Sequence, residues 1–187
     1  MIDVRAAGDA QLRAAADALT EAVRRVGIRF TAEGAEEGLA EGEFAVHQAW
    51  SGDILTARRY ADDPQAAGAL RYWSPPGPAK IVGCDLTAIC ARGRNPVLAH
   101  AFLDHLMRFD VAMDNFRWNG YQPPVQGATP DAFSDPGFPW HGAVPPDLRN
   151  AILTPEQFAQ GQVLVGFGPS ERARWLAQWK RVVAPSA

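Results

Sequence analysis

The residues best suited to chemistry lie in two places along the chain. An aromatic ring and a carboxylate stand close together in Trp50-Ser51-Gly52-Asp53, and Asp85 is a lone carboxylate inside the apolar run from Ile81 to Ile89. Aromatic faces attract cations and cover methylene groups, and carboxylates pair with ammonium groups. These residue types therefore favour the binding of a flexible organic cation.

Each candidate ligand residue also has a purely structural interpretation. Trp50 would serve equally as a core residue at the end of a strand, and Asp53 as an N-cap that accepts a backbone N–H. Asp85 would cap a neighbouring helix or turn, and Tyr121 would fix the turn at Gly120. The sequence by itself leaves both interpretations open.

Motifs of catalysis and metal binding do not occur in the sequence. The four histidines form no HExxH pair, and there is no GxSxG elbow, P-loop or Rossmann glycine pattern. We therefore predict no metal site, no cofactor and no enzymatic activity. The alternative is a small α/β hydrolase or transferase that uses Asp53, Asp85 or the Cys84 thiol.

The two cysteines, Cys84 and Cys90, lie in one apolar stretch. If that stretch is a strand, six steps separate their Cα atoms by roughly 20 Å. A disulfide requires about 4.4–6.8 Å. We expect two small buried hydrophobic residues and no bridge.

Length and charge exclude several classes of protein. The chain has 187 residues and a formal net charge of −3, so it has no basic footprint for nucleic acid. No apolar run has the length of a membrane span. We expect no signal peptide, because no apolar core follows Met1-Ile2-Asp3-Val4-Arg5.

The elements that would position these residues alternate between strands and helices. Apolar residues at helical spacing after Asp9, with Gly27 behind them, predict a helix from Asp9 to Val26. Caps and spacing predict further helical stretches over residues 33–43, 53–60, 95–107, 110–116, 154–160 and 170–182. Strands are expected over residues 28–30, 44–50, 70–73 and 79–91. This alternation is typical of the α/β class.

Two segments interrupt this alternation. Three prolines and a glycine in Ser74 to Pro78 predict an extended linker between two groups of elements. Residues 123–146 are rich in Pro, Gly, Asp and Ala and indicate an irregular surface segment. We expect Trp50 to end its strand facing the linker, Trp73 to pack between lobes, and Trp118, Trp175 and Trp179 to lie in the core.

The order of four segments resembles a known family. They are GEFAVHQAWSGD, RYWSPPGPAKIVGCDLTAI, NPVLAHAFLDHLM and NGYQPP. The set is similar to the solute-binding proteins of bacterial ABC importers, of the spermidine/putrescine-binding type. The resemblance runs from about Asp9 to Val182, although Gly83 stands where the family often has an aromatic residue.

The resemblance implies a type II periplasmic-binding-protein fold, in which two α/β lobes clamp the solute. The family is longer, so this chain resembles its C-terminal half and is expected to form an incomplete two-lobe architecture. Residues 1–76 would belong to the second lobe, residues 77–124 would return to the first lobe, and residues 125–187 would close on the second.

The resemblance also implies a function. Trp50 and Tyr121 would form aromatic walls, Asp85 would pair an ammonium group, and Asp53 would add a nearby carboxylate. The partners would be a polyamine-like cation and the membrane permease of an importer, in the periplasm or anchored outside the cell. The surface left by the missing lobe would invite self-association, and a truncated lobe that binds no ligand is the further alternative.

Overall fold

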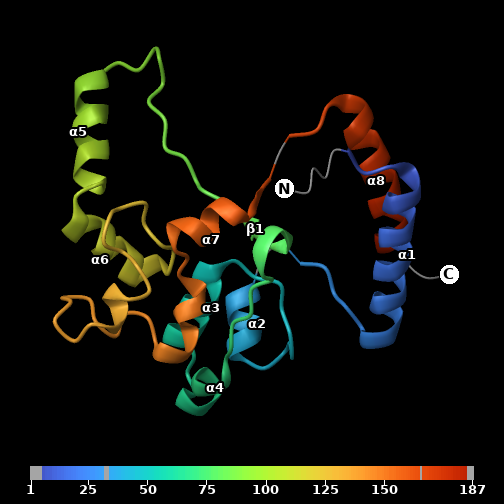
Figure 1. Cartoon of the computed structure of the whole chain (residues 1–187), viewed down its shortest axis with the longest axis horizontal. Helices are drawn as coiled ribbons and strands as arrows, with labels where there is room; N and C mark the ends of the chain where they lie inside the picture. The colour runs from blue at the N-terminus through green and yellow to red at the C-terminus, as the bar shows by residue number, and fades with distance from the viewer. Residues whose placement is uncertain (1–5, 32–33, 165, 185–187) are drawn as a thin grey trace.

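The computed structural model describes residues 6–31, 34–164 and 166–184, and helices predominate in this part of the chain (Figure 1). Its α-helices are α1 (Asp9–Val26), α2 (Ala35–Ala40), α3 (Ser51–Tyr60), α4 (Pro64–Ala69), α5 (Pro96–Leu106), α6 (Phe109–Asn119), α7 (Pro155–Gln160) and α8 (Pro169–Val183). The short 3₁₀ helices are η2 (Gly77–Ala79), η3 (Ala132–Ser134) and η4 (Pro146–Ala151), and the strands are β1 (Ile81–Val82) and β2 (Gln162–Val163).

Helix α1 has the predicted bounds. Gly27 follows it in the left-handed region, with φ +66°, and its N–H donates to the carbonyl of Val23. A glycine adopts this conformation without the steric cost of a Cβ. Asp9 is the first helical residue and Gly8 the N-cap, so the predicted capping role of Asp9 is wrong by one position.

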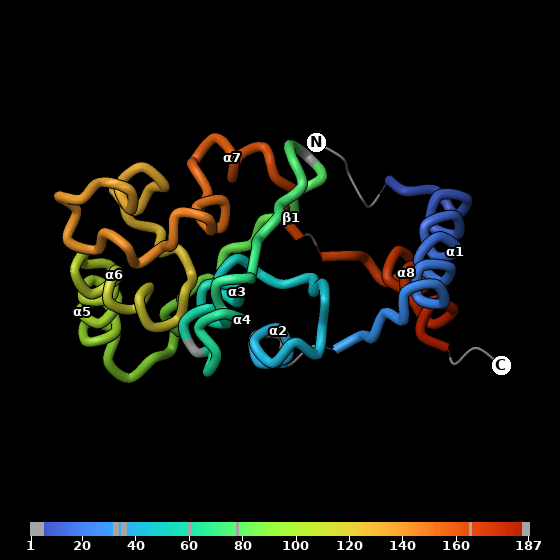
Figure 2. The backbone as a smooth tube through the Cα atoms, turned by 90° about the horizontal axis from the view of Figure 1, so that it is seen from below, coloured from blue at the N-terminus to red at the C-terminus, as the bar shows by residue number. Residues whose placement is uncertain are grey.

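Helices α1 and α8 lie side by side and run in the same direction, although nearly the whole chain separates them. Arg174 donates to Asp9 and Arg181 donates to Asp17, each over 2.7 Å. The residue numbers rise together along both helices, so the pair is parallel. Figures 1 and 2 both show it standing apart from the other elements, which form the body of the molecule.

The body is organised around α6 and α3. Met113 and Phe116 of α6 are fully buried, and Ile54 and Leu55 of α3 pack in the same cluster. The core is completed by residues from the irregular stretch and η4, namely Ala128, Phe133, Val144, Leu148, Ala151 and Ile152. Residues 123–146 are largely irregular, as predicted. They are not only a surface segment, because Ala128, Phe133 and Val144 are buried in the core.

Three predicted strands are absent. Residues 28–30, 44–50 and 70–73 form no strand. Phe44 turns back so that its ring lies against Gly38 of α2, and the N–H of Glu43 donates to the Gly38 carbonyl over 2.9 Å. Near residue 72, the carbonyl of Tyr72 accepts from the side chain of Asn150. Local and side-chain partners thus take backbone groups that a sheet would use.

The strand predicted over residues 79–91 is reduced to β1. Ile81 pairs with Gln162 and Val82 with Val163 in a parallel register. Beyond Val82 no neighbouring strand is present among the described residues, so β1 ends there. Cys84 and Cys90 are free and both exposed, so the predicted burial of these two thiols is wrong.

The predicted helix starts are more accurate than the predicted strands where a side-chain cap is present. Asn95 accepts from the N–H of Leu98 at the start of α5, and Thr154 forms the expected capping box on α7. Helix α8 begins after Gly168, so Ser170 is not its cap. Helix α6 begins after Arg108, and Asp110 lies in its first turn. The predicted helical stretch that begins at Glu33 contains α2, although Glu33 itself lies outside the described residues.

The α/β fold class and the three lobe portions remain predictions. Ser74 to Pro78 leads from the residues after α4 into η2, whose 3₁₀ turn includes Gly77 and Pro78, so this segment is not extended throughout as predicted. Trp73 and Trp118 are both 75% exposed, so their predicted packing is wrong in this chain.

Within the described residues, no helix combines the length and the apolar character that crossing a membrane requires.

An ion-pair network attaches η4 to α3. Asp147 accepts from Arg58 over 2.6 Å and lies 3.2 Å from Arg71. The hydrogen bond from Arg58 lowers the pKa of Asp147, against an opposing effect of desolvation. A carboxylate with a lowered pKa contributes stability above its unfolded pKa, near 4, and loses it as the pH falls through the folded value.

We therefore expect Asp147→Asn to lower the free energy of unfolding at neutral pH by about 1 kcal/mol or less. The difference from the parent protein should vanish below the folded pKa of Asp147. Urea denaturation at a series of pH values between about 2 and 7, which span that transition, measures the difference in free energy of unfolding. Asp131→Asn is the matched control, since Asp131 is exposed and makes no side-chain cap. A constant difference at all pH values would contradict the role of the Asp147 charge.

Candidate functional site

The candidate site is built on the first turn of α3. Trp50 is the N-cap, and Asp53 is the third helical residue. The backbone N–H of Trp50 donates to Oδ2 of Asp53 over 2.9 Å, and the N–H of Asp53 donates back to the Trp50 carbonyl over 3.1 Å. Asp53 is thus part of the helix cap, as its structural interpretation predicted, although Trp50 occupies the N-cap position. A carboxylate here also interacts favourably with the positive end of the helix dipole.

Tyr121 reaches this turn from the segment after α6. Its hydroxyl donates to Oδ1 of Asp53, and its ring lies flat against Gly52. A Cβ on Gly52 would come within 2.5 Å of the ring, so only glycine permits this approach. Trp50, Asp53 and Tyr121, three of the four predicted ligand residues, therefore lie together.

Trp50 is not at the end of a strand, which corrects the prediction, and the contact shown for its ring is with the chain after β1 and not with the predicted linker. Its ring lies near Gly83, where an added Cβ would be 3.5 Å away. Trp50 is 48% exposed and Tyr121 43% exposed. Nearly half of the surface of each residue is thus accessible to a ligand.

Asp85 follows Gly83 by two residues and is exposed. No side-chain bond from Asp85 to the three clustered residues occurs in the described part of the chain. The fourth predicted residue is therefore near the cluster in sequence but is not joined to it. Its expected role as an ammonium partner stays a prediction.

Gln122 holds the Tyr121 turn in place, and sequence reasoning missed it. Its Nε2 donates to the carbonyls of Ala128 and Leu153, over 3.0 and 2.9 Å, and its Oε1 accepts from the N–H of Leu153 over 2.9 Å. The Gln122 amide thus pairs with both the N–H and the carbonyl of Leu153. No local pattern signals such a contact, because the partners are distant in sequence.

Tyr72 lies within electrostatic reach of the cluster. Burial raises the pKa of its hydroxyl, and the negative charge of Asp53 adds to this effect. The phenol therefore stays neutral and can donate a hydrogen bond over the whole physiological range. Tyr72 also packs against the body's core.

Metal chemistry finds no support in the described residues. No three side chains of His, Cys, Asp or Glu gather there in a way that could hold an ion. The Cys84 thiol contacts the carbonyl of Asp85 at 3.7 Å. This contact supplies no base, so it does not activate a nucleophile.

The arrangement can bind a cation. Each oxygen of Asp53 accepts one hydrogen bond in the cluster and retains a second lone pair. The partly exposed side chains of Trp50 and Tyr121 lie beside this negative charge. No protein-family model matches the chain, and no curated protein or solved structure matches it either.

Proposed function

We propose that the chain captures a polyamine-like organic cation at the cluster of Trp50, Asp53 and Tyr121, as the solute-binding component of an ABC importer or a portion of it. The observation that carries the proposal is the Asp53 carboxylate, held by the Trp50 backbone and the Tyr121 hydroxyl beside two half-exposed rings. The rings would cover the methylene groups and the carboxylate would pair an ammonium group.

The rest of the transport role follows from the family resemblance. A receptor of this kind delivers its solute to a membrane permease and acts in the periplasm or anchored outside the cell. Its task is capture rather than turnover. In this role Asp85 would pair a second ammonium group, brought to the cluster when the ligand binds.

Affinity is expected to be low, because the cluster is open to water. One cation–π contact at an exposed site contributes about 0.5–1 kcal/mol, and one exposed ion pair roughly 0–1 kcal/mol. Micromolar binding requires about 8 kcal/mol. We therefore expect millimolar or undetectable binding of spermidine and putrescine.

The test is a titration at constant ionic strength, followed through the indole N–H signals of the six tryptophans by two-dimensional NMR. The Trp50 signal, assigned with Trp50→Phe, should shift with added spermidine, and the Trp118 signal should not. Asp53→Asn should weaken binding roughly fivefold, the equivalent of about 1 kcal/mol.

Asp63→Asn is the matched control. Asp63 also accepts a backbone N–H at a helix start, from Gln65 over 2.8 Å, and is not one of the three clustered residues. It should leave spermidine binding unchanged. A Trp50 signal that stays fixed at high millimolar spermidine, or equal losses from both aspartate variants, would refute the site.

A further inference from the structure

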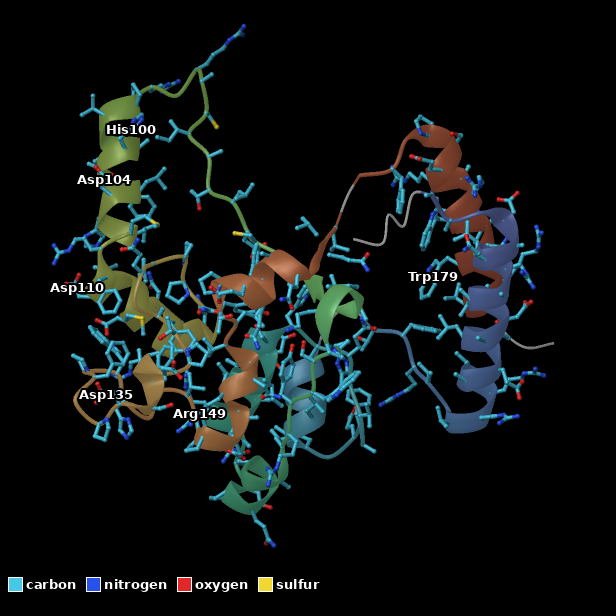
Figure 3. The ribbon with its side chains drawn as sticks, viewed as in Figure 1. His100, Asp104, Asp110, Asp135, Arg149 and Trp179 are labelled. Carbon is cyan, nitrogen blue, oxygen red and sulfur yellow. The ribbon has the colours of Figure 1, made fainter. Side chains whose placement is uncertain are left out.

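The segment from residue 83 to residue 95, here called the connector, leads from β1 to α5 (Figure 1). It contains Cys84 and Cys90, which are free, exposed and the only cysteines in the chain. Figure 3 shows the side chains of the connector standing clear of the body, with His100 and Asp104 labelled on α5 beyond it. Two thiols that are accessible and close in sequence can form a disulfide, provided that the chain between them can bend.

Few contacts hold the connector in its present shape. Beyond Val82 it pairs with no strand among the described residues, and none of residues 84–89 forms a backbone-to-backbone hydrogen bond with them. Every residue from Cys84 to Asn95 is exposed except Ile89, which is partly exposed. Bending this stretch therefore breaks few interactions.

The shortening of the predicted strand also removes the reason for expecting no bridge. In a strand, six residue steps would hold the two Cα atoms roughly 20 Å apart, beyond the about 4.4–6.8 Å that a disulfide spans. The structure reduces that strand to Ile81–Val82, so both cysteines lie outside it. A loop of about ten residues closes within roughly 100 ns in a free chain, so the connector can bring its two thiols together.

The charges around the two thiols differ. Cys84 is followed directly by Asp85. Cys90 is followed two and four residues later by Arg92 and Arg94. All three charged side chains are exposed, and neither arginine forms an ion pair with a described residue. Exposed charges act over about 10 Å at ordinary ionic strength, so an anionic reagent should meet Cys90 more often than Cys84.

We propose that Cys84 and Cys90 form an intramolecular disulfide when the protein meets a low-molecular-weight anionic disulfide such as oxidised glutathione. The Cys90 thiolate attacks one sulfur of the oxidant, whose S–S bond breaks, and one glutathione leaves as a thiolate that takes up a proton. The Cys84 thiolate then attacks the Cys90 sulfur and releases the second glutathione. The two released glutathione thiols carry the two electrons and two protons that the protein loses. The bridge requires no bound cation, so it is independent of the proposed function.

The bridge also changes the reach of α5. With the two Cα atoms within about 7 Å of each other, residues 84–90 no longer extend the connector. Helix α5 is then held closer to the body, and Asp85 is enclosed in the ring that the disulfide closes.

Concentration decides between a bridge within one chain and a bridge between two chains. A short flexible loop gives its two ends an effective concentration on the order of millimolar. At roughly ten micromolar protein, the internal bridge is then favoured about a hundredfold over a bridge between chains. The expected product is a single chain with one closed loop.

The test places the full chain in mixtures of oxidised and reduced glutathione, with quenched samples analysed by mass spectrometry and non-reducing electrophoresis. The parent protein should lose two hydrogen atoms, keep no glutathione adduct and form no linked dimer. Cys84→Ser and Cys90→Ser should each accumulate one glutathione adduct instead, because neither has a second thiol. Both positions are exposed, so the serine variants should remain folded, which circular dichroism checks.

The same two variants test the order of the steps. At low ionic strength, the Cys90 thiol of Cys84→Ser should react with oxidised glutathione about threefold faster than the Cys84 thiol of Cys90→Ser. The ratio of the two rates should fall with added salt, and it should be smaller for the uncharged hydroxyethyl disulfide. Equal rates with oxidised glutathione would overturn the proposed order of attack.

Two products of the parent protein would overturn the bridge itself. One is a chain with a glutathione adduct on both thiols, and the other is a dimer linked through them, in each case with no internal bridge at any ratio of oxidised to reduced glutathione. Either product would show that the connector holds its two thiols apart in solution.

Discussion

Gly120→Ala is expected to destabilise the body by about 2–5 kcal/mol and to displace Tyr121 from the cluster. Gly120 ends α6 with φ +76°, a conformation that costs other residues roughly 1–2 kcal/mol. An added Cβ would also lie 2.5 Å from the Gly52 carbonyl oxygen and 3.2 Å from Leu55. Relieving such a clash costs typically about 1–3 kcal/mol more.

The matched control for this change is Gly142→Ala. Gly142 has a similar φ of +80°, but an added Cβ there would meet nothing within 4 Å. This variant should therefore lose only the stability that a left-handed backbone conformation costs a residue with a Cβ. Urea denaturation followed by near-ultraviolet circular dichroism measures both variants. Equal losses of stability would show that the close approach of Gly120 to α3 is not present in solution.

Phe116→Ala is the second large effect, with an expected loss of about 3–5 kcal/mol. Phe116 is fully buried, and its ring packs 5.1 Å from the ring of Phe133. Truncation removes apolar burial and leaves a cavity between α6 and the irregular stretch. Since a whole domain is stable by only about 5–15 kcal/mol, the body should unfold at much lower urea concentrations.

Phe158→Ala provides the comparison for Phe116. Phe158 is 40% exposed on α7, and truncating it should cost less than about 1 kcal/mol. The same denaturation experiment applies to both. If Phe116→Ala were tolerated as well as Phe158→Ala, the packing of α6 at the centre of the body would be wrong.

The helices were largely predictable, because their signals are local. A left-handed glycine after α1, an asparagine cap before α5 and a capping box at Thr154 all act within one helical turn. The strands were not predictable in the same way. A run such as residues 79–91 has the composition of a strand, but a strand exists only where a second one pairs with it, and β2 offers two residues.

The candidate site was predictable in its residue types and only partly in its geometry. Trp50 and Asp53 are close in sequence, and the family resemblance pointed to Tyr121. The bond from the Tyr121 hydroxyl to Asp53 depends on the meeting of α3 with the end of α6. The Gln122 contacts that hold this turn depend on Leu153, a partner that no local pattern reveals.

The parallel pairing of α1 with α8 also has a consequence during protein synthesis. Helix α1 leaves the ribosome first among the described helices, and the partner that covers Leu12 and Ala16 is the last of them to emerge. At typical translation rates the interval is roughly ten to thirty seconds. During this interval the nascent chain carries an amphipathic helix with an open apolar face, and ribosome-associated chaperones would meet that face before α8 does.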